Sequence, residues 1–215
     1  MAKLLSAAHD RPSAAPGFPP PRLSTFKTLD KVLQTVRDMF QDRGYQWVEK
    51  SHWPADLPPL DDLKAIGRDA QNQAVWVYFA TEMKVPVKRI REYIQHMDSQ
   101  QVTHAIIVHA FQITPGAKAE LSQKHVIETF QAQELYENRT RHSLVPRHEA
   151  VTTEADVQAI MQQYHLSSKN ELPIYYTSDP VVRYYHWPPG TVVRIHRTLG
   201  GLKEPEVYYR VVRPD

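Results

Sequence analysis

The chain has 215 residues, of which 41% are hydrophobic, a formal net charge of +2 and no cysteine. This composition is that of an ordinary soluble protein with one large core or two small ones, and it excludes disulfides, thiolate zinc sites and cysteine nucleophiles. No apolar run is long enough to predict a membrane span, and the N-terminus lacks the apolar core of a signal peptide. The small net charge does not by itself indicate a nucleic-acid-binding protein, so any DNA contact is expected to be local.

The beginning of the chain divides into a proline-rich tail and a helix. Residues 1–25 carry prolines among small residues, which predicts a disordered or extended segment; the alternative is a proline-rich ligand for a partner. From Thr28, apolar residues recur at three- and four-residue steps, which predicts a helix that stops at Gly44. Its apolar stripe consists of Leu29, Val32, Leu33, Val36, Met39 and Phe40.

The segment after this helix predicts short elements around a proline-rich loop. Tyr45–Val48 has the composition of a strand, and a loop with three prolines follows it. Leu60–Ile66 is expected to form a short helix. Ala74–Ala80 is an apolar run rich in β-branched and aromatic residues, which predicts a buried strand.

A helix and a second apolar strand come next. Pro86 suits the first turn of a helix whose apolar side chains form one stripe. The stripe consists of Val87, Ile90, Ile94 and Met97. His104–Ala110 reads as a strand, and the order strand, helix, strand predicts a right-handed parallel crossover. The N-terminal part of the chain is therefore expected to be an α/β domain.

The loop after the second strand has two interpretations. Thr114 is a natural helix cap and Pro115 suits a first helical turn, so an ordinary helix start explains the segment. Loops that follow strands of an open α/β sheet are also favoured ligand positions, and Lys118 offers a positive charge to a phosphate.

The remaining elements predict a smaller α+β unit. His125–Phe130 is expected to be a strand, and a helix is expected to begin at Thr152 or Thr153. Asp179 and Pro180 mark the start of a short helix that ends at Pro188. Residues 191–197 and 206–212 read as strands joined by a turn at Gly200 and Gly201. The buried stripe of the first of these helices consists of Val157, Ile160, Met161 and Tyr164.

The C-terminal segment resembles a known family. The run DPVVRYYHWPPGTVVRIHR, preceded by Leu172-Pro173 and closed by Tyr208-Tyr209-Arg210, resembles the assembly domain of the fifth subunit shared by the eukaryotic nuclear RNA polymerases, a domain that also has an archaeal counterpart. His142–His148 resembles the family's HxLVPxH segment, and weaker matches extend the resemblance over residues 29–212. The resemblance implies an α/β N-terminal jaw domain plus a small α+β C-terminal assembly domain. The expected boundaries are 1–25 for the tail, 26–141 for the jaw and 142–215 for the assembly domain.

The family implies a non-catalytic role in transcription. The segment ITPGAK resembles its ITPSAxK element, the jaw tip that approaches downstream duplex DNA. The DNA-contacting residues implied are Thr114, Pro115, Gly116, Ala117 and Lys118. The subunit-interface residues implied are His148, Asp179, Pro180, Arg183, Tyr184, Arg194, Arg197, Tyr209 and Arg210. The implied partners are the largest polymerase subunit, other polymerase subunits and downstream DNA, without a membrane or a cofactor, in the nucleus.

The sequence also departs from the family pattern. The family's LPRI is here Leu172–Tyr175 without the arginine, and the turn at Thr198–Leu202 and the segment Trp187–Gly190 differ from the usual residues. A divergent lineage, a paralogue dedicated to one polymerase and a viral copy are all consistent with these differences.

Histidine spacing argues against a metal site. The chain has 11 histidines, but His104 and His109 face opposite sides of a strand, and His142 and His148 flank a proline in an extended segment. No HExxH motif occurs, and cysteine is absent. We therefore predict no metal site.

Two other interpretations remain open from the residues alone. Asp61 or Asp62 with Glu82-Met83-Lys84 has the layout of an Mg²⁺-dependent nuclease, so a free-standing α/β nucleic-acid-binding or nuclease-like protein is the alternative function. The arginines and tyrosines of the C-terminal segment form either an RNA-binding face or a protein interface, and the neutral charge of that region favours the interface.

Overall fold

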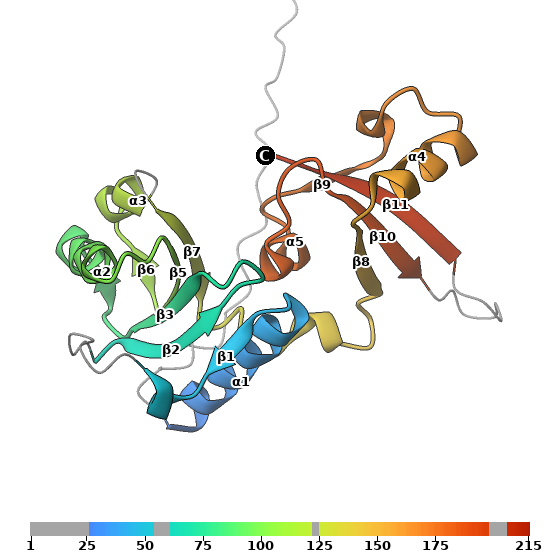
Figure 1. Cartoon of the computed structure of the whole chain (residues 1–215). Coiled ribbons are helices and arrows are strands. Elements are labelled where there is room, and N and C mark those ends of the chain that lie inside the picture. The colour runs from blue at the N-terminus through green and yellow to red at the C-terminus, as the bar shows by residue number, and fades with distance from the viewer. Residues whose placement is uncertain (1–25, 54–60, 122–124, 198–205) are drawn as a thin grey trace, which may run out of the picture.

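The chain forms two units of mixed helices and strands, each built on its own sheet. The computed structural model describes residues 26–53, 61–121, 125–197 and 206–215. We call residues 26–141 the N-terminal half and residues 142–215 the C-terminal half, and Figure 1 shows the two lying beside one another. Within the described ranges, no helix is both long and apolar enough to cross a membrane.

The N-terminal half has a mixed five-stranded sheet in the order β1-β2-β3-β5-β7. Its helices and longer strands are α1 (Phe26–Asp42), β1 (Gln46–Val48), β2 (Leu63–Arg68), β3 (Ala74–Ala80), α2 (Val87–Ser99), β5 (His104–His109), α3 (Pro115–Leu121) and β7 (Val126–Gln131). The short strands β4 (Lys84–Val85) and β6 (Gln112–Ile113) pair with each other, and η1 (Lys50–His52) and η2 (Arg139–Arg141) are 3₁₀ turns. β1, β2 and β3 pair antiparallel, while β3, β5 and β7 are parallel. The expected parallel arrangement of the two apolar strands around α2 is confirmed.

Helices cover both faces of this sheet. The predicted stripe of α1 packs on one face, where Val32, Val36, Met39 and Phe40 are buried. α2 and α3 cover the opposite face (Figure 1). Because both faces are covered, the central strands are apolar along their whole length, which is why Ala74–Ala80 reads as a continuous run.

The helix predicted over Leu60–Ile66 is wrong: among the described residues, Asp61 and Asp62 form a turn and Leu63–Ile66 belong to β2. Leu63 and Ile66 both pack on the α2 side of the sheet. Residues three apart in a regular strand face opposite sides, but a bulge between Leu63 and Ala65 inserts one extra residue and restores the same side. The bulge therefore imitates helical spacing in the sequence.

The C-terminal half has a four-stranded sheet in the order β8-β10-β11-β9. Its elements are β8 (Arg147–Val151), α4 (Glu154–Gln163), η3 (Lys169–Glu171), β9 (Ile174–Tyr176), α5 (Pro180–Tyr185), β10 (Val192–Arg197) and β11 (Glu206–Arg213). The predicted helix starts are confirmed, because Thr153 caps α4 and Asp179 caps α5. β10 and β11 form the expected antiparallel hairpin. The turn expected at Gly200 and Gly201 lies outside the described residues, and so do the tail of residues 1–25 and the proline-rich loop at 54–60.

The two helices of this half pack on opposite faces of its sheet. α4 packs through Val157 and Ile160 on one face. α5 packs through Val182 on the other face, against Val193 and Val212. Figure 1 shows α5 lying between the two halves, so this short helix belongs to the C-terminal fold and also faces the N-terminal sheet.

Candidate interaction surfaces and the junction between the halves

The segment Thr114–Lys118 forms the start of α3. The Oγ1 of Thr114 accepts a hydrogen bond from the amide of Ala117 at 3.3 Å, so the ordinary helix-cap interpretation is confirmed. Pro115, Gly116 and Lys118 are exposed, and Thr114 is half-buried. Ala117 is fully buried against α2, so its side chain takes no part in an exposed contact.

Gly116 approaches α2 closely. A Cβ atom at Gly116 would lie 3.1 Å from Cγ2 of Val87, which is tighter than most real contacts. A serine here, as in the family pattern, would therefore require a small shift of Val87. The exposed cation of the segment is Lys118, whose ammonium group has no carboxylate or hydrogen-bond partner within the described part of the chain.

A polar cleft of about 570 Å³ opens next to Lys118 at the carboxyl ends of β5 and β7. We call it the carboxyl-edge cleft. His109 and Gln131, at the ends of these strands, line it together with Lys118. Arg183 of α5 lines it from the C-terminal half, so both halves contribute to the same cleft.

The charged groups of the carboxyl-edge cleft have different partners. Arg183 donates to Oε1 of Glu134 at 3.0 Å and to the carbonyl oxygen of Thr129 at the edge of β7. His109 donates from Nδ1 to the carbonyl oxygen of Phe111. Burial lowers the pKa of His109 below its ordinary value, since the charged imidazolium is less well solvated there.

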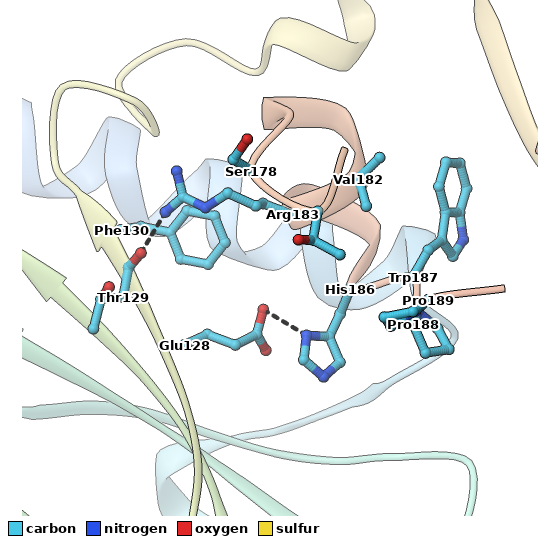
Figure 2. Close-up of a pocket in the computed structure, with 11 residues that line it drawn as sticks. Glu128, Thr129, Phe130, Ser178, Val182, Arg183, His186, Trp187, Pro188 and Pro189 are labelled. Atoms are coloured by element: carbon cyan, nitrogen blue, oxygen red, sulfur yellow. Dashed lines mark hydrogen bonds and ion pairs between the residues drawn. The ribbon is translucent and has the colours of Figure 1, made fainter. Parts of the chain in front are cut away.

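A buried carboxylate joins the halves. Both oxygens of Glu128 on β7 bind the guanidinium of Arg43 at 2.8 Å, and the Arg43 side chain is only 1% exposed. Nε2 of His104 lies 2.8 Å from one oxygen of Glu128, and Nδ1 of His186 lies 3.1 Å from the other. Figure 2 shows Glu128 and His186 facing each other in the cleft of about 610 Å³ between the halves.

The environment of Glu128 favours its ionised form. Burial alone would raise the pKa of Glu128, but the charge of Arg43 and the hydrogen bonds from His104 and His186 hold it well below the ordinary value. His186 reaches the carboxylate because it ends α5 in the left-handed conformation, with φ of 54°. The junction is therefore a buried ion pair supported by an imidazole from each half.

Three residues of the junction, His104, Glu128 and His186, could also hold a metal ion, which the spacing of the histidines in the sequence did not reveal. Ligand atoms of His104, Glu128 and His186 lie within 4.8 Å of one another. The two imidazoles bind different oxygens of the carboxylate, and Arg43 already balances its charge through both oxygens. These contacts describe an ion-paired junction better than a metal centre.

Further hydrogen bonds join α5 to the N-terminal half. Arg43 donates to the carbonyl oxygens of Tyr184 at 2.7 Å and Arg183 at 2.9 Å. The hydroxyl of Tyr184 donates to Asp42 at 2.8 Å and accepts from Asn138 at 3.0 Å. Two residues predicted to face another subunit, Arg183 and Tyr184, thus make their contacts inside this chain.

The other predicted interface residues lie on three surfaces. Asp179 and Pro180 begin α5, where Asp179 accepts a hydrogen bond from the amide of Val181 at 2.8 Å. Arg194 lies over the ring of Tyr209 at 5.7 Å from its centroid, on the face that α4 covers.

His148, Arg197 and Arg210 lie on the opposite face of the C-terminal sheet. The guanidinium of Arg210 lies 5.7 Å from the ring centroid of Tyr175, and that of Arg197 lies 5.7 Å from the ring centroid of Tyr208. Nε2 of His148 lies 3.2 Å from the hydroxyl of Tyr175. We call these five residues the open sheet face.

The nuclease-like acidic residues are bound to an arginine. Arg89 of α2 donates to Glu82 at 2.9 Å and to Glu92 at 2.8 Å, and its Nε lies 3.7 Å from Asp62. Asp62 also accepts a hydrogen bond from the hydroxyl of Tyr93 at 2.6 Å. Arg89 thus holds the position among the carboxylates in which a cation would be stabilised.

The sequence did not single out Arg43, Glu128 or His186. These residues lie far apart in the chain, and only the fold brings them together. The one signal was a glutamate inside the predicted strand His125–Phe130, because a charged side chain within a buried element requires a partner.

Comparisons with known proteins match the two halves to different families. The family model described as "RNA polymerase Rpb5, C-terminal domain" matches residues 137–212. The family model described as "Restriction endonuclease" matches residues 28–138. A solved structure titled "Structure of EndoMS-dsDNA2 complex" aligns over 52% of this chain and 48% of its own, with 13% identity and a TM-score of 0.35, a likeness too weak to support a common fold.

Curated relatives match most of the chain. "DNA-directed RNA polymerases I, II, and III subunit rpabc1" of Dictyostelium discoideum is 34% identical over 178 residues, which cover 79% of this chain and 89% of the relative. "DNA-directed RNA polymerases I, II, and III subunit RPABC1" of Caenorhabditis briggsae is 33% identical over 197 residues, covering 90% of this chain and 85% of the relative. These matches extend across both halves.

Proposed function

Because the chain belongs to the family of the shared RNA polymerase subunit RPABC1, or Rpb5, and residues 28–138 belong to the restriction-endonuclease domain family, we propose that it is an architectural subunit with a DNA-facing jaw. Membership makes it a non-catalytic subunit of a DNA-directed RNA polymerase. In our proposal the N-terminal half is the lower jaw beside downstream duplex DNA. The C-terminal half anchors the chain to the largest subunit, and the complex acts in the nucleus.

The junction at Glu128 is the observation that carries this proposal. A subunit that guides DNA without chemistry works by holding one surface at a fixed position relative to another. Glu128 and Arg43 form a nearly dry ion pair, and Arg43 also binds two carbonyl oxygens of α5. Such a network fixes the orientation of the two halves, since moving them apart would take His186 away from Glu128 and leave buried donors of Arg43 without the carbonyl oxygens of α5.

The open sheet face has the chemistry of a protein interface. Its arginines lie over tyrosine rings, and Tyr208 is 40% exposed. Arginine and tyrosine are enriched in interfaces because their planar groups offer contact area and hydrogen bonds together. We therefore assign the contact with the largest subunit to His148, Arg197 and Arg210 of this face. Arg183 and Tyr184, which hold the halves together, are assigned an indirect role.

Lys118 is the residue that we assign to the DNA backbone, with Thr114, Pro115 and Gly116 beside it. An exposed ammonium group that has no partner among the described residues can contact a phosphate without reading sequence. Replacing Lys118 with alanine in the polymerase is expected to weaken binding to downstream duplex DNA modestly. The slope of log affinity against log salt is expected to become shallower by about 0.9, the contribution of one phosphate contact.

The matched control for Lys118→Ala is Lys64→Ala. Lys64 is also exposed but lies on β2, away from β7 in the strand order. Its removal should leave the salt slope unchanged. An unchanged slope for Lys118→Ala, measured by fluorescence anisotropy with a labelled duplex, would refute the DNA contact.

A nuclease is the second candidate, favoured by the restriction-endonuclease model that matches residues 28–138. Its chemistry would require Asp62 and Glu82 to hold Mg²⁺, but both carboxylates lie against Arg89. The purified chain is therefore expected to leave supercoiled plasmid intact in Mg²⁺ or Mn²⁺. Cleavage that disappears in Glu82→Gln would establish the nuclease instead.

A further inference from the structure

The carboxyl-edge cleft gathers cationic groups from both halves. Lys118 enters it from α3 and Arg183 enters it from α5. Only Glu134 brings a negative charge among the described lining residues, and its Oε1 binds Arg183 while its Oε2 accepts the amide of Gln131. With neutral His109, the cleft carries one net positive charge and a carboxylate that is already hydrogen-bonded.

We propose that the carboxyl-edge cleft binds one backbone phosphate of duplex DNA, held by Lys118 and Arg183, with His109 as a further donor when it is protonated. This proposal rests on the proposed function of the N-terminal half as a DNA-facing jaw. It makes α5 a contributor to DNA binding in addition to its role in joining the halves.

Arg183 is held in place for such a contact. Two of its five N–H groups bind Glu134 and the carbonyl oxygen of Thr129, and its guanidinium lies over the ring of Phe130 at 4.8 Å from the centroid. Figure 2 shows the Arg183 side chain reaching from α5 to Thr129. A guanidinium that is already oriented loses little side-chain freedom when its remaining donors bind a phosphate oxygen.

His109 links phosphate binding to pH. Its Nδ1 is bound to a carbonyl oxygen, which can only accept, so Nδ1 carries the proton and neutral Nε2 carries a lone pair. The charged groups that face His109 are Lys118, Arg183 and Glu134. A phosphate in the cleft favours the imidazolium, whose Nε2 becomes a donor. DNA binding should then take up a proton, and affinity should rise as the pH falls through the histidine range.

The test uses polymerase reconstituted with the full chain carrying His109→Gln, Glu134→Gln or Lys118→Ala, and the probe is a labelled duplex of random sequence. At alkaline pH, His109→Gln should bind as wild type. As the pH falls below the ordinary histidine pKa of about 6.5, the affinity of the wild type for the duplex should rise more steeply than that of His109→Gln. The difference between the two should be up to about tenfold per pH unit. Glu134→Gln should bind the duplex more tightly and with a steeper salt slope, because it removes the one negative charge among the described residues that line the cleft.

The variants separate this proposal from the proposed function. If Lys118→Ala makes the salt slope shallower while His109→Gln keeps the wild-type pH dependence and Glu134→Gln keeps wild-type affinity, the jaw contact stands and the phosphate site in the cleft is refuted. If none of the three changes DNA binding, both are refuted. A reduced pH dependence in His109→Gln together with tighter binding by Glu134→Gln would establish the cleft.

Discussion

Replacing Arg43 with alanine is expected to destabilise the chain by about 3–5 kcal/mol, the usual cost of leaving one partner of a buried ion pair alone. The Arg43 side chain is 1% exposed, and its partner Glu128 is 10% exposed. The substitution also removes the donors to the carbonyl oxygens of Tyr184 and Arg183, which weakens the contact of α5 with the N-terminal half. For a chain of this size, the loss corresponds to a fall in the melting midpoint of about 10 °C.

Urea unfolding followed by circular dichroism measures this loss, and Arg91→Ala is the matched control. Arg91 also pairs with a glutamate, Glu120, but its side chain is 67% exposed, so its removal should change the free energy of unfolding far less than Arg43→Ala does. The double variant Arg43→Met with Glu128→Leu should recover much of the stability, because it leaves no charge buried alone. A loss of under about 1 kcal/mol in Arg43→Ala would refute the buried ion pair with Glu128 as a stabilising element of the junction.

Two further predictions concern stability. The pKa of Glu128 is lower in the folded chain than its unfolded value of about 4.3. Ionised Glu128 therefore contributes fully to the free energy of unfolding above about pH 4.3, and this contribution is lost as the pH falls through the folded pKa. Unfolding free energy measured from pH 7 to pH 3 should fall less steeply in Glu128→Gln than in the wild type, and parallel curves would contradict this. Gly67→Ala should cost about 1–3 kcal/mol, because its Cβ would lie 2.2 Å from Cε2 of Phe40. A melting midpoint equal to that of the wild type would show that Phe40 moves freely.

The helices and strands that were predicted correctly are those whose sequence pattern depends on a single feature of the element itself, such as which of its faces are buried or how it is capped. The stripe of α1 has helical spacing because one side of the helix is buried, and Ala74–Ala80 is continuously apolar because both faces of its sheet are covered. The cap residues Thr153 and Asp179 act within their own turn. The segment Leu63–Ile66 was wrongly predicted as helix because a bulge places Leu63 and Ile66 on the same face of the strand. Only the pairing of β2 with β3 reveals this bulge.

The junction could not be predicted in the same way. Arg43, Glu128 and His186 come from three distant segments, and none has a spacing that marks a partner. The interface role of Arg183 and Tyr184 came from the family resemblance and stays a prediction. The sequence did not predict that α5 also packs against the N-terminal half, where Arg43 binds its carbonyl oxygens.

The most direct test of the architectural role is affinity purification of the tagged chain from cells, followed by quantitative mass spectrometry. We expect the large subunits of RNA polymerase to be recovered with the chain at a fixed one-to-one ratio. Combined replacement of Arg197 and Arg210 on the open sheet face should lower this recovery while the purified variant stays folded. Recovery of the chain without polymerase subunits would contradict the architectural role.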